Sequence, residues 1–594
     1  AFAWSAASAQ ETGGDGEMER LLNEFRSNFE ESELIEAPTR HLKPLGFTAE
    51  DVTVITAREI KAMNAHTVAE ILNRIPGLFG NMFNFQFGGA SFFSVHGAEP
   101  RSVLLMIDGI EINYLSEGAG ETHWIPVQII ERIEIIRGPA SAAWGSALSG
   151  VVNIVTKVPG GPESPRGFLG GSIGKNQTVD YRLEFSDRGR LDYYLFAGFK
   201  GTEGLFPGRS FNDLNLYSKL IFKPNGSSKI TLSIGHSQPY TNLGDFEDHD
   251  FTYDLQEQVF WSALDFRTYL TSKLTLYLSA RHLQQNIELD YDSLGLGIFG
   301  PPGSRYKDLI LNEESTGISG KIVWKHPRNT LVLGADGDWG QLHQTVKAGE
   351  TLQSIYWAPP TIRTNPDFDK WAVFINDTII LDEGKWSITP GMRYDRNSID
   401  GSHFSYNLGL TFSPDKSTIF RASVGKGFGL PALAWSSGGG GFYSPNPDLD
   451  SEEVWSYQAG MESNALKNLR IKGSAFYHEV ENVIKTEITN PDQQSPSKIY
   501  LNNGIIRRHG FELEVETAPL HGFSIYTGVA YVRFNPTDEY GASKNYSFDF
   551  ALRYDNSEYF KAELFGHYIN RDLDDNLDDS LDEKDDIIWD LNIS

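Results

Sequence analysis

The sequence predicts an all-β transmembrane barrel preceded by a smaller α+β domain. From about residue 166 to residue 594, segments of roughly ten residues alternate between apolar and polar side chains, as barrel strands with one face in lipid do. Short and long connections between these segments also alternate along the chain. No apolar run reaches the ~18 residues that a membrane-spanning helix needs, so strands are the elements expected to cross a bilayer.

Length, charge and cysteine content narrow the class of protein. A chain of 594 residues requires two domains or one very large β-structure. The net charge of −28 disfavours nucleic acid as a partner, because binding it needs a basic surface. The absence of cysteine from the sequence excludes disulfides and thiolate metal sites, and it fits an oxidising compartment outside the cytoplasm.

The N-terminal 50 residues divide into two parts. The first ten, AFAWSAASAQ, are small and apolar and end as a signal-peptide cleavage site does. We expect residues 1–10 to be the remnant of a secretory signal, with an unstructured tail as the alternative. Residues 11–50 form an N-terminal segment, in which apolar side chains at helical spacing predict a short amphipathic helix over residues 18–29.

Residues 51–160 are expected to form one compact α+β domain. DVTVITAREI predicts a strand that runs into a helix, and HTVAEILNRIPG predicts a helix that ends at its Pro-Gly pair. SVLLMIDGI predicts a buried strand followed by an Asp-Gly turn. In IERIEIIRGP the alternation places Ile130, Ile133 and Ile135 or Ile136 inward, and VVNIVTK is the last strand.

The connections after residue 166 are sorted by length. The tight ones are 187–190, 224–228, 271–273, 326–329, 382–385, 414–418 and 465–468. The long ones are 239–257, 292–312, 347–369, 434–453 and 488–502. Short turns at one rim and long loops at the other are typical of an outer-membrane barrel. A soluble sandwich or propeller would also alternate, but it has no reason to sort its loops in this way.

Specific motifs then resemble one family, the TonB-dependent receptors. IERIEIIRGPASAAWGSALSGVVNIVTK (130–157) is similar to the signature of the family's plug domain, as are the earlier ILNRIPGL, SVHGAEPRSVLLMIDGIEIN and VTVITAREI. Three later segments are similar to the family's barrel strands, namely FRASVGKGFGLPAL (420–433), NPDLDSEEVWSYQAGME (446–462) and YLNNGIIRRHGFELEVE (500–516). The resemblance assigns the structural motif of the plug to Arg137, Gly138, Pro139, Gly145 and Gly150.

The resemblance implies a 22-stranded barrel with the N-terminal α+β domain plugging its lumen. The alternating segments number about twenty from Gly167 to the final IIWDLNIS, and the chain ends in Ser594 rather than an aromatic residue. We therefore expect a final hairpin, roughly 35–50 residues, to be missing from the sequence. An imperfect count of the strands is the alternative.

The resemblance also implies function. It predicts active uptake of a scarce, large solute across the Gram-negative outer membrane by a monomeric receptor, with a ferric siderophore first and cobalamin or haem as alternatives. The expected partners are a TonB-type coupling protein in the periplasm, outer-membrane lipid and lipopolysaccharide. A passive channel or a surface-binding barrel is the rival class, although neither needs a plug of ~110 residues. We expect no enzymatic activity and no tightly bound cofactor, since the 14 histidines are scattered and the sequence has no Gly-x-Ser-x-Gly, HExxH or phosphate-loop motif.

The coupling segment, or TonB box, is expected just before the plug. By resemblance it comprises Glu33, Leu34, Ile35, Glu36, Ala37, Pro38 and Thr39. These residues alternate like a strand that has no partner in the chain, so an edge donated by the coupling protein would complete it. A plain linker is the alternative.

Aromatic side chains in two irregular plug loops are the candidate ligand contacts. Loop 79–93 contains Phe83, Phe85 and Phe87, and loop 113–124 contains Tyr114, His123 and Trp124. Their rings suit aromatic or macrocyclic ligands through stacking. Packing of the same rings against the barrel wall is the alternative.

Charged residues suggest two further features. We expect Arg137, Arg101 and Glu131 or Glu134 to form ion pairs, because a charge inside a barrel lumen must be paired, and pairs between plug and wall would act as a releasable latch. Asp245, Asp248 and Asp250 are hard oxygen ligands in a predicted outer loop, where they could bind calcium. A solvated acidic loop is the alternative for these aspartates and for the acidic run 574–586.

Overall fold

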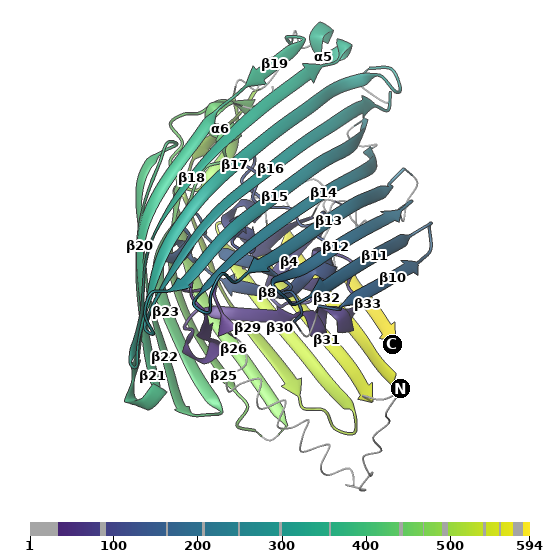
Figure 1. Ribbon diagram of the computed structural model, residues 1–594. Helices are drawn as coiled ribbons and strands as arrows, with labels where there is room; N and C mark the ends of the chain where they lie inside the picture. The colour runs from purple at the N-terminus through teal and green to yellow at the C-terminus, as the bar shows by residue number, and fades with distance from the viewer. Residues whose placement is uncertain are drawn as a thin grey trace.

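The protein is a β-barrel with an N-terminal plug domain inside its lumen (Figure 1). The computed structural model describes residues 34–82, 89, 91–161, 164–204, 208–246, 250–295, 300–355, 358–438, 443–466, 468–489, 497–537, 542–556, 560–573 and 586–593. The signal remnant, the helix expected at 18–29, Glu33, the loop phenylalanines Phe83, Phe85 and Phe87, and Asp248 lie outside these ranges.

The plug is built on a five-stranded mixed sheet in the order β3-β8-β9-β6-β7. Its strands are β3 (Asp51–Thr56), β6 (Val103–Ile107), β7 (Ile110–Glu111), β8 (Ile130–Arg137) and β9 (Gly150–Thr156). A separate hairpin joins β4 (Leu78–Met82) and β5 (Ser91–Val95), and a short pair joins β1 (Leu34–Ile35) and β2 (Lys43–Pro44). The helices are η1 (Leu45–Phe47), α2 (Ala57–Met63), α3 (Val68–Leu72), η3 (Pro100–Ser102), η4 (Val127–Ile129) and α4 (Ser141–Trp144).

Local sequence accounts for the plug elements. Thr56 and Glu59 form a capping box at the start of α2, in which each side chain bonds the other residue's backbone N–H. Ile133 and Ile135 of β8 are fully buried in the core, and Ile130 and Ile136 are nearly so. The strand-into-helix segment and the three later strands predicted from sequence are confirmed, and so is a helix in HTVAEILNRIPG, although it ends at Leu72, before the Pro-Gly pair.

The barrel is one antiparallel sheet in which β10 to β33 follow one another around the wall. Its first strands are β10 (Gly167–Ile173), β11 (Val179–Asp187), β12 (Leu191–Thr202), β13 (Phe211–Phe222), β14 (Ser228–Phe246), β15 (Phe251–Tyr269), β16 (Leu274–Ser293), β17 (Arg305–His326), β18 (Asn329–Ala348), β19 (Thr361–Thr364) and β20 (Asp367–Leu381). The remainder are β21 (Trp386–Asn397), β22 (Gly401–Asp415), β23 (Thr418–Gly429), β25 (Glu452–Ser463), β26 (Leu469–Glu481), β29 (Ile505–Thr517), β30 (Phe523–Asn535), β31 (Ala542–Asn556), β32 (Phe560–Leu573) and β33 (Asp586–Ile593).

The long connections carry small elements of their own. They include α5 (Glu350–Ile355), α6 (Leu433–Ser437) and a small sheet of β24 (Tyr443–Ser444), β27 (Ile484–Thr489) and β28 (Ser497–Asn502), while η6 (Asp382–Gly384) lies in a tight turn. The described part of the sheet has 21 strands, but β19 and β20 pair with the two ends of β18 and share one position. That leaves twenty positions, as the alternation predicts. In the described residues β10 pairs only with β11, and β33 only with β32.

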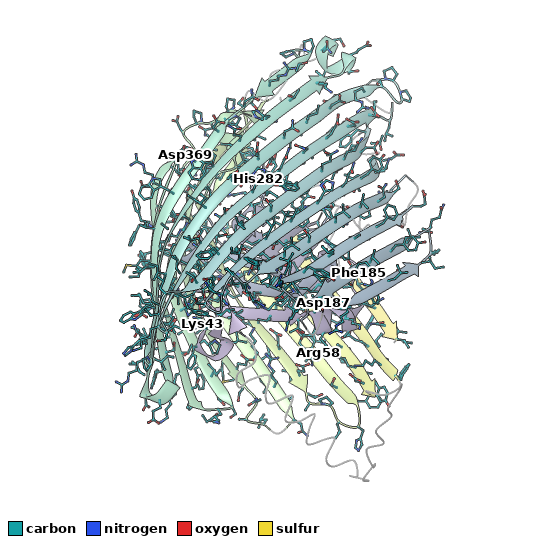
Figure 2. The ribbon with its side chains drawn as sticks, viewed as in Figure 1. Lys43, Arg58, Phe185, Asp187, His282 and Asp369 are labelled. Carbon is teal, nitrogen blue, oxygen red and sulfur yellow. The ribbon has the colours of Figure 1, made fainter. Side chains whose placement is uncertain are left out.

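The outer face of the barrel is apolar around its middle. On β12, Leu191, Leu195 and Phe199 are exposed, whereas Asp192 and Tyr194 between them are buried. Phe185 of β11, labelled in Figure 2, is likewise exposed. Such a band is what lipid requires of a strand's outer face. No helix in the described ranges is long and apolar enough to cross a bilayer.

The predicted loop 239–257 is largely strand, which corrects the sequence interpretation. β14 continues to Phe246 and β15 starts at Phe251, with Tyr240 opposite Gln256. β15 has 19 residues and β17 has 22, whereas a tilted strand crosses the membrane in ~9–11. The strands therefore continue to satisfy each other's backbone groups well beyond the membrane, where polar side chains hide that pairing from a sequence reading.

A plug latched to the barrel wall

Arg137, at the end of β8, forms the central ion pair between plug and wall. Its guanidinium is fully buried and donates to Glu512 of β29 at 2.5 Å, as well as to Asp51 of the plug at 3.2 Å. Burial alone would lower the pKa of Arg137, but Asp51 and Glu512 outweigh it and raise that pKa. Glu512 also bonds His96 of the plug at 3.1 Å. The predicted pairing of Arg137 is confirmed, and its partner is the wall.

The loop after Arg137 requires glycine where it meets the wall. Gly138 has φ +104°, and a Cβ there would lie 1.9 Å from Nε2 of Gln458, which donates to the carbonyl of Arg137 at 2.8 Å. A Cβ at Gly150 would lie 2.7 Å from the carbonyl oxygen of Ile136. Gly138 therefore favours glycine because of its positive φ, and Gly150 because a backbone carbonyl approaches it closely.

A second cluster ties the N-terminal segment to the same loop. Arg40 and Arg393 of β21 each donate to Asp336 of β18 at 2.6 Å. Both guanidinium groups also reach the carbonyl oxygen of Ala143 in α4, at 3.4 and 3.3 Å. Asp336 thus holds one arginine from the N-terminal segment and one from the wall.

The segment predicted to be the TonB box has a partner in this structure, contrary to the sequence expectation. Leu34 and Ile35 pair with Pro44 and Lys43, and Ile35 and Ala37 are 0 % exposed. The carbonyl of Ala37 accepts from Trp144 Nε1 at 2.6 Å. The chain folds back so that β2 supplies the edge that an isolated strand would lack.

Further contacts hold the segment 34–44 at the end of the barrel with tight turns. Glu134 of β8 accepts from the backbone N–H groups of Glu36 and Ala37 at 3.1 and 2.9 Å, and it pairs with Arg132. Glu36 also pairs with Lys321, near the turn that follows β17, at 2.6 Å. Glu134 is therefore part of the plug's link to the segment rather than a plug–wall pair.

A third latch lies toward the long loops. Arg101 binds Glu452 of β25 in a bidentate pair, at 2.7 and 2.9 Å, and Glu99 at 2.5 Å. On the other wall, Glu313 of β17 accepts from the backbone of Leu115 and Ser116 at 2.5 and 3.1 Å. The predicted pairing of Arg101 is confirmed. Glu452 and Glu512 were not anticipated, although Glu512 belongs to the alternating FELEVE, where acidic residues share the inward face of a strand.

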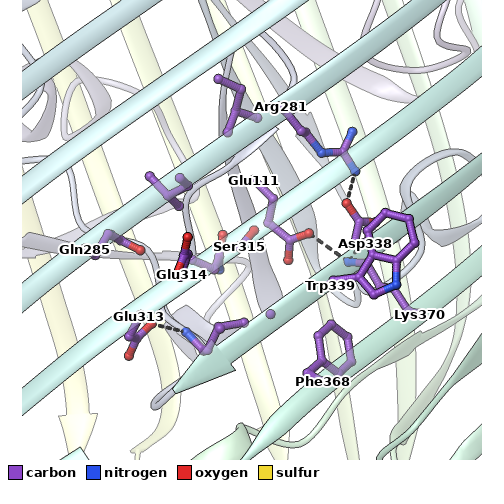
Figure 3. A pocket seen from close by; sticks show the side chains of 15 residues that line it. Glu111, Arg281, Gln285, Glu313, Glu314, Ser315, Asp338, Trp339, Phe368 and Lys370 are labelled. Atoms are coloured by element: carbon purple, nitrogen blue, oxygen red, sulfur yellow. Dashed lines mark hydrogen bonds and ion pairs between the residues drawn. The ribbon is translucent and has the colours of Figure 1, made fainter. Parts of the chain in front are cut away.

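The space between β7 and the wall is a packed interface. Figure 3 shows Glu111 of β7 directed at Lys370 of β20, 2.9 Å away, beside an Arg281–Asp338 pair of the wall. The cavity that these residues line holds only about 40 Å³, which is room for a few water molecules at most. It cannot take a large solute in this state.

The loop residues Tyr114, His123 and Trp124 require a correction. They are 5, 1 and 0 % exposed, and they contact the wall instead of the outside. The hydroxyl of Tyr114 donates to Glu257 of β15 at 2.8 Å, and Trp124 lies 5.2 Å from Trp261, centroid to centroid. Burial of the plug's apolar core against β12–β16 draws these rings inward, which favours the packing alternative.

Of the three aspartates predicted to bind calcium, only Asp245 and Asp250 lie in the described part of the chain. Asp245 is exposed and Asp250 is buried, and they lie on either side of residues outside the described ranges. Within those ranges, no group of three convergent carboxylate or imidazole ligands includes either of them.

The plug meets its surroundings in two different ways. Its apolar core continues into the wall at β12–β16, through Tyr194, Tyr217 and Trp261 among others. Against β23–β32 it leaves a cavity of about 240 Å³. The charged side chains lining that cavity are Glu59, Arg74, Arg421, Glu462, Arg470, Lys472, Glu514, Glu516 and Arg553.

Known proteins share both the domains and the fold. A family model described as "TonB-dependent Receptor Plug Domain" matches residues 45–152, and one described as "TonB dependent receptor-like, beta-barrel" matches residues 174–554. The vitamin B12 transporter BtuB of Vibrio vulnificus (strain CMCP6) is 25% identical over 466 residues, which is 75% of this chain and 70% of that protein.

Solved structures agree with these matches. The siderophore receptor PirA from Pseudomonas aeruginosa superposes with a TM-score of 0.66 at 18% identity, covering 93% of each chain. P. aeruginosa FpvA, in a complex with a heterologous pyoverdine and iron, gives 0.73 at 11% identity over 96% of this chain and 82% of that one. The chain therefore belongs to the TonB-dependent receptors, which are outer-membrane proteins of Gram-negative bacteria.

Proposed function

We propose that this receptor takes up a ferric siderophore actively across the outer membrane, driven by a TonB-type coupling protein in the periplasm. One observation carries the proposal: the lumen is filled by a plug that buried ion pairs hold against the wall. A buried ion pair contributes little net stability, because the loss of water around both charges offsets their attraction. It nevertheless fixes one geometry. Such an interface suits a plug that closes tightly and must also be moved.

The N-terminal segment is the proposed handle. Pairing of residues 33–39 with a strand of the coupling protein would replace the β1–β2 pairing. Displacement of Ala37 and Arg40 would then break the Trp144 bond and leave Asp336 with Arg393 alone. Force that the coupling protein applies to the N-terminal segment would thus be transmitted to α4 and to the glycine loop after Arg137 through direct contacts.

The passage is proposed to open beside β23–β32. The plug is joined to β12–β16 through a continuous apolar core, whose exposure would be costly at about 25 cal/mol per Å². On the opposite side the charged cavity of about 240 Å³ already separates plug and wall. Water can replace ionic partners there, so this side can part at lower cost.

Cobalamin is the second candidate substrate. The match to the vitamin B12 transporter BtuB over 466 residues favours it. The siderophore receptors PirA and FpvA are similar to this chain in fold alone, since their identities are 18% and 11%.

A pair of uptake assays tests the proposal. Cells with and without the receptor gene are supplied with labelled ferric siderophore or labelled cobalamin, under iron or cobalamin limitation. Receptor-dependent iron uptake that disappears without the coupling protein supports the proposal. Receptor-dependent cobalamin uptake alone selects the second candidate, and uptake that persists without the coupling protein would identify a passive channel.

A further inference from the structure

A buried group of ligand atoms joins the plug to the wall at Glu121, His123 and Glu257. Glu121 and His123 belong to the plug loop before η4, and Glu257 belongs to β15. Nδ1 of His123 lies 2.9 Å from Glu121, and its Nε2 lies 2.5 Å from Glu257. One atom from each residue lies within 4.8 Å of the others, and the described residues contain no second group of this kind.

Both carboxylates of this group pair with the same imidazole ring. Nδ1 of His123 and Oε2 of Glu121 are inaccessible to solvent and lie 2.9 Å apart as an ion pair. The carboxylate of Glu257 is oriented by the hydroxyl of Tyr114 at 2.8 Å. A fixed carboxylate, a second carboxylate and an imidazole, all buried at one place, are a set of ligands that a metal ion would hold together in place of a ring proton.

The charges of the group also favour a bound cation. Two carboxylates in a buried site need a cation, because an unpaired buried charge is costly. The imidazolium proton can supply one positive charge, whereas a divalent ion bound to neutral imidazole would balance both carboxylates.

We propose that Glu121, His123 and Glu257 bind one divalent transition-metal ion of the Zn²⁺ type, which staples the plug to the barrel wall. Imidazole nitrogen with carboxylate oxygen is a ligand set for zinc-like ions, whereas calcium takes six to eight oxygens. With bonds of ~2.0–2.2 Å, tetrahedral ligand atoms lie roughly 3.3 Å apart, whereas the present atoms are up to 4.8 Å apart, so a carboxylate needs to shift by up to about 1.5 Å.

The location explains what the ion would do. The outward side chains of β15 change from Gln256 and Gln258 to Phe260, so Glu257 faces inward at the outer border of the apolar band. The ligands come from both domains, and plug displacement would therefore separate them. An ion bound only to the closed state stabilises that state by RT ln(1 + [L]/Kd). The metal would thus hold the plug closed at its outer end.

The test uses the purified, chelator-treated receptor in detergent and Zn²⁺ as the probe. Calorimetric titration should show one site per chain in the wild type, at least a hundredfold weaker in His123→Gln and in Glu257→Gln. The matched control is His282→Gln, which removes an exposed His–Glu pair of the barrel, 3.7 Å to Glu314, and should leave the titration unchanged. Ca²⁺ should not compete.

Hydrogen exchange of residues 121–125 supplies a second readout. Zn²⁺ should slow this exchange in the wild type and in His282→Gln, but not in Glu257→Gln, whose amide oxygen can still accept from Tyr114 and keep the loop folded. Absence of a single-site titration in the wild type would overturn the proposal. Equal titrations in wild type and both site variants would do so too, since the metal would then be adventitious. Neither outcome bears on uptake, so the staple and the proposed function can fail separately.

Discussion

Glu512→Gln should loosen the plug without unfolding the barrel. The wild-type carboxylate accepts from Arg137 at 2.5 Å and from His96 at 3.1 Å, across the boundary between β29 and the plug. Glutamine keeps the shape of the side chain and one acceptor but removes the charge. The mutation therefore weakens one latch of the plug and leaves the strand pairing of β29 intact.

The expected magnitude follows from the partners that Arg137 keeps. Leaving a buried charge wholly unpaired costs ~3–5 kcal/mol. Arg137 retains Asp51 at 3.2 Å and Glu514 at 3.5 Å, so the loss is closer to that of one charged hydrogen bond, about 1.5–3 kcal/mol. At 1.4 kcal/mol for each factor of ten, opening of the plug should become roughly 10–150 times more frequent.

Native-state hydrogen exchange of β8 and β9 measures that opening. The matched control is Glu514→Gln on the same strand face, since its carboxylate lies 3.5 Å from Arg137 and is partly exposed. We expect it to accelerate exchange by less than about tenfold, because partly exposed pairs contribute ~1 kcal/mol or less. Equal exchange in the two variants, or wild-type exchange in Glu512→Gln, would refute the assignment of the latch to the Arg137–Glu512 pair.

Three further predictions concern the N-terminal segment and the phenylalanines of residues 83–87. Ile35→Pro removes a residue of the β1–β2 pairing and should abolish uptake while ligand binding at the cell surface persists; uptake by this variant would remove the handle assignment. Burial, aided by Lys43, lowers the pKa of His41 from 6.5 to about 4, so a proton is taken up only when the segment detaches. Docking of the N-terminal segment on the plug should therefore weaken as pH falls below 6.5, by about 2 kcal/mol at pH 5. Hydrogen exchange of residues 34–44 should become faster at low pH in the wild type but not in His41→Gln. Alanine at Phe83, Phe85 and Phe87 together should weaken ligand binding by about 3 kcal/mol, and an unchanged Kd would mean that these rings only pack.

Local patterns were sufficient for most of the fold. The Thr56–Glu59 spacing and the alternation in β8 lie within a few residues, so the strand-into-helix segment and the buried isoleucines can be read directly. The sorting of connections by length gives the barrel and its twenty strand positions. The extension of β14 and β15 beyond the membrane was missed, because their outward residues turn polar there and look like a loop.

The site depends on contacts between distant parts of the chain. Arg137 and Glu512 are 375 positions apart, and Tyr114 and Glu257 are 143 apart, so no sequence window contains both partners. A charge inside a barrel must be paired, which is why the existence of a latch could be predicted while its acceptor could not. The pairing of Ile35 with Lys43 depends on a fold-back through a turn at 36–40, where Pro38 indicates a turn but not the strand that the turn brings back.

Whether the plug must be pulled aside is best measured as ligand uptake by living cells that carry or lack the coupling protein, with surface binding measured in the same samples. If the plug closes the barrel and must be pulled aside, removal of the coupling protein should abolish receptor-dependent uptake of the labelled ferric siderophore and leave surface binding unchanged. Uptake at the wild-type rate in its absence would mean that solute passes the plug unaided, and it would contradict the account.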